Sequence, residues 1–311
     1  MNLLSTENRL REQAAAYVSL VRLPNLFTAP PDVLLGAVLV GFGVDRSGVA
    51  VPIEHVVSLS VVSMLLYGAG TTLNDYVDLP VDAVERPERP LPSHAVSPQT
   101  ALSFGIGLLI VAIAAASLLV GPAATLVTVL LGGMILLYDF ALKGTPLGFA
   151  AMGLSRGLNI VLGMTAFGRP ELSATLFFAP VVIAGYIASV TWMAADETTG
   201  GTRHRILITQ AMTGVVSLTV VVLGILLDVR LLTLGAAVML VFGFLLVTNR
   251  QLRLAYNSQT PAAMGTAVGT CVLWLVVVDT ALIALFTLRG AALTSGFFLA
   301  AKLLSVRVDI S

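Results

Sequence analysis

Nine apolar segments, each long enough to cross a lipid bilayer, dominate the chain. They lie near residues 26–44, 55–74, 98–119, 122–138, 147–166, 174–195, 206–227, 231–248 and 264–288. A transmembrane α-helix needs about 20 apolar residues, and only helices and closed barrels satisfy all their backbone polar groups within lipid. A barrel strand uses segments of only about ten residues. The sequence therefore predicts an all-α integral membrane bundle of about nine transmembrane helices.

Charged residues are scarce outside a few clusters. Asp, Glu, Lys and Arg make up 11% of the chain, and the formal net charge is zero, whereas soluble proteins carry about 25% charged residues. The sequence has no basic stripe or nucleic-acid motif, so nucleic-acid binding is not supported. The single cysteine, Cys271, excludes an internal disulfide, and the three histidines lack metal-ligand spacing. The candidate functional residues are therefore those in the charged clusters.

The whole chain is predicted to form one integral membrane domain, residues 1–311. Its expected parts are a surface helix at 1–24, a nine-helix bundle at 25–290 with polar caps near 75–97 and 196–205, and a C-terminal tail at 291–311. The N-terminal segment has the mixed polar and apolar pattern of an amphipathic helix and lacks the apolar core of a signal peptide. A weaker apolar piece near 291–305 predicts a short surface helix, with part of a tenth span as the alternative.

The positive charges predict how the bundle is oriented. With nine spans, the N-terminus lies on the same side as the ends of the even-numbered helices. Lys and Arg on that side are Arg9, Arg11, Arg22, Arg86, Arg89, Lys143, Arg203, Arg205, Arg250 and Arg253. The opposite side holds Arg46, Arg169 and Arg230 in its loops and Arg289, Lys302 and Arg307 on the C-terminal tail. Cytoplasmic loops are enriched in Lys and Arg. We therefore expect a multi-pass cell-membrane protein whose N-terminus and active-site opening are cytoplasmic and whose C-terminus is outside.

The segment after the second apolar run concentrates the acidic residues. Asp75, Asp78 and Asp82 stand at i, i+3 and i+7, so they share one helix face if the helix continues past the apolar run. Three such carboxylates repel each other unless a hard cation lies between them, and their oxygens suit Mg²⁺ together with substrate phosphates. Arg86 and Arg89 follow, and arginine binds phosphate through two parallel hydrogen bonds. A solvated loop of mixed charge is the alternative interpretation.

These residues resemble a known motif. Asn74, Asp75, Asp78 and Asp82 match the N-D-x-x-D-x-x-x-D motif of the UbiA superfamily of intramembrane prenyltransferases. The arginine-rich R-P-L stretch that usually follows is seen here as Arg89-Pro90-Leu91, and the resemblance runs from Arg22 to about residue 290. It implies a UbiA-like bundle around a central cavity. It also implies Mg²⁺-dependent transfer of a prenyl chain from an allylic prenyl diphosphate to an acceptor that the sequence does not identify.

A second element follows the fourth apolar segment. Tyr138 to Pro146 resembles the Y-x-x-x-x-K-x-T-P element of many UbiA-type enzymes. In that family the lysine contacts diphosphate and the tyrosine lines the site, so the resemblance implies these roles for Lys143 and Tyr138. The alternative is that Asp139 and Lys143 form an i,i+4 pair that only ends a helix.

The second Asp-rich motif of the family is eroded in this chain. Where the family has a D-x-x-x-D pattern after the sixth helix, Asp196 and Glu197 are adjacent and position 200 is Gly. Adjacent residues do not face the same way on a helix. We expect at least one of the two carboxylates to serve the Mg²⁺ site, and a second Mg²⁺ remains open.

Two charged residues lie inside apolar segments. Insertion of Asp or Arg at a helix centre costs about 2.5–3.5 kcal/mol, so Asp32 and Arg156 are expected to face the bundle interior. Pro30-Pro31 should kink the first helix and free backbone carbonyls near Asp32. Arg156 either contacts diphosphate or bridges to Asp32. Arg22 belongs to the resemblance or only sets topology, and Asp279 has no predicted role.

The sequence thus predicts one site with divided roles. The catalytic set is Asp75, Asp78 and Lys143; diphosphate binding falls to Asn74, Arg86, Lys143, Arg156, Tyr138 and Asn159; the Mg²⁺ ligands are Asp75, Asp78, Asp82, Asp196 and Glu197. Three alternatives stay open: an intramembrane terpene cyclase on the same fold, a transporter with an ion path through Asp32, Arg156 and Asp279, and a non-catalytic UbiA-like protein. The sequence does not specify the prenyl chain length, the acceptor or the oligomeric state.

Overall fold

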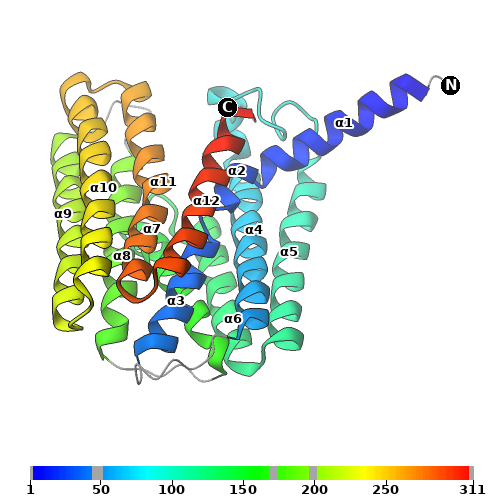
Figure 1. Cartoon of the computed structure of the whole chain (residues 1–311). Coiled ribbons are helices and arrows are strands. Elements are labelled where there is room, and N and C mark those ends of the chain that lie inside the picture. Colours follow the sequence, from blue (N-terminus) through cyan, green and yellow to red (C-terminus); the bar gives the residue numbers. More distant parts are fainter. Residues whose placement is uncertain (1–2, 44–51, 169–173, 196–201, 308–311) are drawn as a thin grey trace.

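The computed structural model describes residues 3–43, 52–168, 174–195 and 202–307, and all regular elements within these ranges are helical. They are α1 (Leu3–Leu20), α2 (Leu23–Leu26), α3 (Pro30–Gly43), α4 (Ile53–Glu85), α5 (Pro98–Leu119), α6 (Pro122–Leu137), the π-helical turn η1 (Tyr138–Leu142), α7 (Pro146–Met164), the 3₁₀ turn η2 (Thr165–Phe167), α8 (Ala174–Ala194), α9 (Arg203–Leu226), α10 (Leu231–Ser258), α11 (Pro261–Phe286) and α12 (Leu288–Arg307). Figure 1 shows most of the long helices standing side by side.

Nine spans in the described part of the chain are long and apolar enough to cross a membrane, and α2 and α3 together make the first. The predicted all-α membrane bundle is therefore confirmed. α4 continues to Glu85, well beyond the apolar run that ends near residue 74. The condition for placing Asp75, Asp78 and Asp82 on one helix is thus met.

Several helices begin where the sequence carries a start signal. Proline occupies the first helical position of α5, α6, α7 and α11, where its missing N–H is not needed. Thr145 and Thr260 accept hydrogen bonds from backbone N–H groups in the first turns of α7 and α11. These caps fix where each helix leaves its loop, and the cap at Thr145 lies directly beside the site.

The core has two apolar clusters that meet at α3 and α7. The first cluster contains buried residues of α3, α4, α5, α6, α7 and η2. The second contains buried residues of α3 and α7 together with residues of α8, α9, α10, α11 and α12. α3 and α7 approach closely because each helix carries a glycine at the contact. A Cβ on Gly36 of α3 would lie 1.9 Å from the Ile160 carbonyl oxygen, and a Cβ on Gly163 of α7 would lie 2.1 Å from the Val33 carbonyl oxygen. This contact brings the charged residues of the two helices together in the middle of the bundle.

The two terminal helices lie differently from each other. α1 reaches out from one end of the bundle, and near its C-terminal end Ala16 and Leu20 pack against Leu91 and Val96 (Figure 1). α12 packs against α2, α3 and α11 and runs back toward the end of the bundle that carries α1 (Figure 1).

Two expectations concern α12. The stretch at 291–305, expected to form a short surface helix, belongs to α12, which packs against α11, and α12 ends at the end of the bundle that carries α1 (Figure 1). Arg289 and Lys302 lower the hydropathy of this segment. Its packing depends instead on small buried residues, Ala291, Thr294 and Ala301, which allow close helix contact.

Candidate active site

A cavity of about 570 Å³ opens beside the C-terminal part of α4. Its polar lining includes Arg22, Asn74, Asp78, Arg86, Arg89, Tyr138, Asp139, Lys143, Arg156 and Asn159, and its apolar lining includes Leu66, Leu131, Ile135, Ile187, Val190, Val268 and Val272. The lining comes from both halves of the bundle. One cavity therefore joins a strongly charged region to an apolar wall within the membrane-spanning helices.

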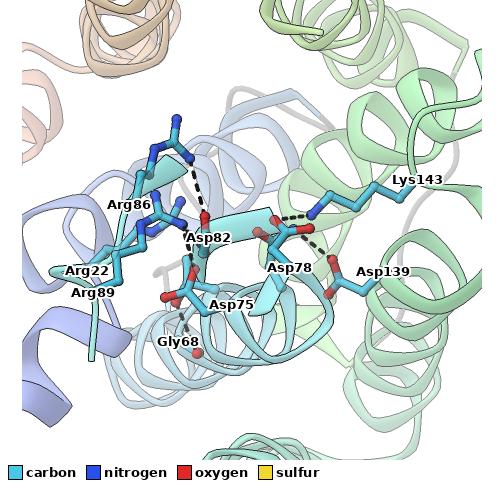
Figure 2. Close-up of polar contacts among 11 residues, drawn as sticks. Arg22, Gly68, Asp75, Asp78, Asp82, Arg86, Arg89, Asp139 and Lys143 are labelled. Carbon is cyan, nitrogen blue, oxygen red and sulfur yellow. Dashed lines mark hydrogen bonds and ion pairs between the residues drawn. The ribbon is translucent and has the colours of Figure 1, made fainter. Parts of the chain in front are cut away.

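Arginines gather on one side of the site (Figure 2). Asp75 Oδ1 lies 2.8 Å from Arg22 Nη2 and 3.4 Å from Arg89 Nη1. Arg89 Nη1 also donates to Asp82 Oδ2 at 2.7 Å, and Arg86 Nη1 lies 3.8 Å from Asp82 Oδ1. Arg89 thus bridges two of the three predicted metal-binding carboxylates. The positive charge between Asp75 and Asp82 is a guanidinium group.

Local backbone structure holds these arginines in place. Arg22 caps α2 with φ of 49°, a left-handed conformation that is uncommon for a residue with a side chain. Burial lowers the pKa of Arg22, but the neighbouring Asp75, Tyr67 and Asp82 together outweigh burial, so the pKa is raised above its usual value. Arg89 lies in a loop that folds back through a hydrogen bond from Val96 N to Pro90 O at 3.0 Å. The Arg22 guanidinium group therefore remains charged beside Asp75.

Lys143 and a fourth acidic residue, Asp139, lie on the other side of the site (Figure 2). Lys143 Nζ donates to Asp78 Oδ2, and Asn74 Nδ2 donates to Asp139 Oδ1 at 3.0 Å. The Asp139–Lys143 helix-ending pair is therefore not the arrangement found. Lys143 reaches across to α4 instead.

The turn that carries Lys143 is irregular. Tyr138 to Leu142 form the π-helical turn η1, and π-turns within helices frequently mark functional sites. Gly144 follows with φ of 75°, a conformation that glycine adopts without strain. Thr145 then caps α7. The K-x-T-P element is thus a tight connection between α6 and α7 that presents Lys143 to the cavity.

The deepest polar group of the cavity lies between α3 and α7. The kink predicted at Pro30-Pro31 is present as the break between α2 and α3. The freed carbonyls of Thr28 and Ala29 accept hydrogen bonds from Arg156 and Asn159, respectively. Arg156 Nε also lies 2.8 Å from Asp32 Oδ2.

Asn159 connects this group to α4. Its Nδ2 donates to Asp32 Oδ2 at 2.8 Å, and its Oδ1 accepts from Ser63 Oγ at 2.7 Å. Arg156 and Asn159 both line the cavity. The buried bridge to Asp32 and a place at the cavity wall are therefore compatible for Arg156.

The arrangement departs from the predicted set in three respects. Asp75, Asp78 and Asp82 share a helix but point to different partners, and the described ranges contain no group of three or more His, Cys, Asp or Glu side chains arranged to hold a metal ion. Asp196 and Glu197 fall outside the described residues, so the second motif stays a prediction. Arg22 and Arg89 belong to the site although the predicted set omits them. Their signals were the Arg22-x-Pro-Asn25 start of the first helix and the R-P-L stretch.

The oxygen donors fit a hard divalent cation. Asp78, Asn74 and Asp139 all line the cavity, and the Asp78 side chain retains 25% of its exposure. Carboxylate and amide oxygens are ligands of Mg²⁺, which keeps several waters and usually takes one or two carboxylates plus phosphate oxygens. The Asp78 carboxylate is thus accessible from the cavity.

Comparison with known proteins gives a consistent result. The UbiA prenyltransferase family matches residues 34–264. A digeranylgeranylglyceryl phosphate synthase from Methanopyrus kandleri is 32% identical over 163 residues, covering 52% of this chain and 57% of that protein. Another from Methanococcoides burtonii is 33% identical over 162 residues, covering 51% and 57%. The chain thus matches little more than half the length of these relatives.

Solved structures share the fold at low sequence identity. A digeranylgeranylglyceryl phosphate synthase has a TM-score of 0.58 at 20% identity, covering 90% of this chain and 99% of the other. A UbiA homologue from Archaeoglobus fulgidus bound to GPP and Mg²⁺ has a TM-score of 0.58 at 14% identity, covering 86% and 99%.

Proposed function

The chain belongs to the UbiA prenyltransferase family, and from this premise we propose that it transfers a prenyl chain from an allylic prenyl diphosphate to an acceptor within the membrane. One observation carries the proposal: a single cavity combines five basic side chains with a wall of aliphatic residues, and the basic residues are Arg22, Arg86, Arg89, Lys143 and Arg156. A prenyl diphosphate has the matching halves, an anionic head and an apolar tail.

The basic side chains supply the electrostatic part of the reaction. Arg22, Arg89 and Lys143 are each held by a carboxylate, and a diphosphate that replaces those carboxylates accepts the same hydrogen bonds. Donors already placed at the leaving group stabilise the charge that develops as the C–O bond breaks. Arg156 and Asn159 face the same cavity from α7, and we assign them to the diphosphate as well.

The apolar lining performs the second task. Leu131, Ile135, Val268 and Val272 border the cavity and would surround the isoprenoid tail. They also keep water away from the allylic cation, which would otherwise be hydrolysed. Tyr138 lies where the two regions meet, on the turn between α6 and α7.

Mg²⁺ is the cofactor that these donors suit. We propose that Asp75, Asp78 and Asp82 hold it, with Asp196 or Glu197 contributing from the second motif. When bound, Mg²⁺ supplies Lewis-acid stabilisation of the departing diphosphate. The Archaeoglobus fulgidus homologue of this fold binds GPP and Mg²⁺ together, which supports the assignment.

The names of the relatives support one class of acceptor. Digeranylgeranylglyceryl phosphate, named for the synthases in this comparison, is an isoprenoid ether of glyceryl phosphate. We propose an acceptor of this class, a membrane-resident glyceryl phosphate whose hydroxyl group takes the prenyl chain. The basic end of the bundle also carries Arg250 and Arg253 on α10, and by the positive-inside rule we place this end, with the site opening, at the cytoplasmic face.

A product assay tests the proposal. Purified full-length protein is incubated with Mg²⁺ and geranyl, farnesyl or geranylgeranyl diphosphate, with and without a prenylated glyceryl phosphate, and pyrophosphate and lipid products are measured. We expect acceptor-dependent pyrophosphate release and a prenyl ether product. Release without acceptor together with a cyclic hydrocarbon would identify a cyclase instead. Absence of release with every donor would refute the proposal.

A further inference from the structure

The buried pair formed by Asp32 on α3 and Asp279 on α11 has no role in the site described above. Both residues have no exposed surface, and their side chains lie within hydrogen-bonding range of each other. Neither residue lines the cavity. They lie next to Arg156 and Asn159, where α3 packs against both α7 and α11.

Three of the four carboxylate oxygens of this pair lack a hydrogen-bond donor among the described residues. Asp32 Oδ2 accepts from Asn159 and faces Arg156. No N–H or O–H group of the described residues donates to Asp32 Oδ1 or to either oxygen of Asp279. Unpaired buried acceptors of this kind are rare, because each loses its hydration without replacement.

The charges of Arg156, Asp32 and Asp279 indicate which group donates the missing hydrogen bond. Arg156 faces the pair from α7, and one guanidinium group balances one carboxylate. Two ionised carboxylates in contact would leave a second negative charge buried within the bundle, which carries a large desolvation cost. A single proton held between the pair removes this charge and joins Asp32 Oδ1 to one of the two Asp279 oxygens.

We propose that Asp32 and Asp279 share one proton, which Asp279 donates to Asp32 Oδ1, and that Asp279 is thereby a positioning residue for the cavity. With Oδ1 occupied by Asp279, Asp32 presents Oδ2 to Arg156 and Asn159. The orientation of these two cavity residues therefore depends on a helix of the opposite half of the bundle. The proton assignment stands on the buried geometry alone, whereas the effect on substrate rests on the proposed function.

Infrared spectroscopy of the full chain in lipid nanodiscs tests the proton directly. We expect wild type to show the C=O stretching band of a protonated, buried carboxyl group, and Asp279→Asn to lose it. Asp228→Asn is the matched control, because Asp228 is exposed at the opposite end of the bundle, and it should keep the band. A wild-type spectrum without the band, or a band that survives in Asp279→Asn, would overturn the assignment.

Kinetics test the positioning role. The side-chain amide that Asp279→Asn introduces can still donate to Asp32, so KM for the prenyl diphosphate should stay near the wild-type value. Asp279→Leu removes the donor and should raise KM about tenfold, the effect of leaving one buried acceptor unpaired. Equal KM values in the two variants would overturn this role. A wild type with the infrared band but no turnover would overturn the proposed function and support the shared proton.

Discussion

The two charged clusters of the bundle use the same residue types, but the cluster at the end of α4 contains a partly exposed ion pair. There Asp78 and its partner Lys143 retain 25% and 30% of their side-chain exposure, whereas Asp75 and Asp82 are buried. In the cluster at α3, α7 and α11, Asp32 is fully buried and the Arg156 side chain is 11% exposed. Partly hydrated ion pairs contribute little to stability, whereas buried pairs are costly to break. The Asp78–Lys143 pair is therefore the one that we expect to exchange partners for a ligand.

The largest expected effect separates function from folding at the partly exposed Asp78–Lys143 pair. Asp78→Asn should lower pyrophosphate release by about a thousandfold, because it removes a proposed Mg²⁺ ligand worth several kcal/mol in the transition state. Thermal stability should change little, since exposed pairs of this kind contribute about 0–1 kcal/mol. Glu88→Gln, in the exposed loop after α4, is the control and should retain activity. Near-normal turnover of Asp78→Asn would remove Asp78 from the metal site.

The buried cluster should respond in the opposite way. Arg156→Leu should destabilise the protein by about 3–5 kcal/mol, because Asp32 loses the guanidinium that compensates its charge. Thermal unfolding in detergent measures this loss. The double variant Asp32→Leu with Arg156→Leu should recover much of the stability. It should stay inactive if Arg156 also binds diphosphate, and an active double variant would show that Arg156 is purely structural.

A glycine contact tests how strictly the buried cluster is positioned. Gly36→Ala should cost about 1–3 kcal/mol, the usual range for overpacking, because its Cβ would lie 1.9 Å from the Ile160 carbonyl oxygen. The displaced α3 would carry Asp32 away from Arg156. Gly107→Ala on α5 is the control, with no atom within 4 Å of the new Cβ, and it should be neutral or slightly stabilising. Equal unfolding temperatures for both variants would refute the close α3–α7 contact.

The smallest expected effect concerns the arginine that bridges two carboxylates. Arg89→Lys keeps the charge but loses the planar group that reaches both Asp75 and Asp82, so kcat/KM should fall about tenfold. Arg253→Lys, on the exposed face of α10, should leave kcat/KM unchanged. An Arg89→Lys variant with wild-type kinetics would show that only the charge at this position matters.

The comparison also shows which features a sequence can reveal. The cluster at the end of α4 lies within one local stretch from Asn74 to Arg89, plus a short element at Lys143. The spacing of its aspartates indicated one helix face. The buried cluster draws on Asp32, Arg156 and Asp279, separated by more than a hundred residues each. The cost of charge in lipid predicted that Asp32 and Arg156 face inward, but it offered no role for Asp279.

The sequence by itself determined the membrane class, the nine spans, the kink at Pro30-Pro31 and the helix that carries Asp75, Asp78 and Asp82. These features follow from hydropathy, proline chemistry and residue spacing, which are local properties. The tertiary structure decided that Arg89 and Arg22 pair with Asp75, that α12 returns along the bundle, and that Asp279 meets Asp32. Such contacts depend on how distant helices pack, and packing is set by the joint shape of many side chains rather than by any one segment.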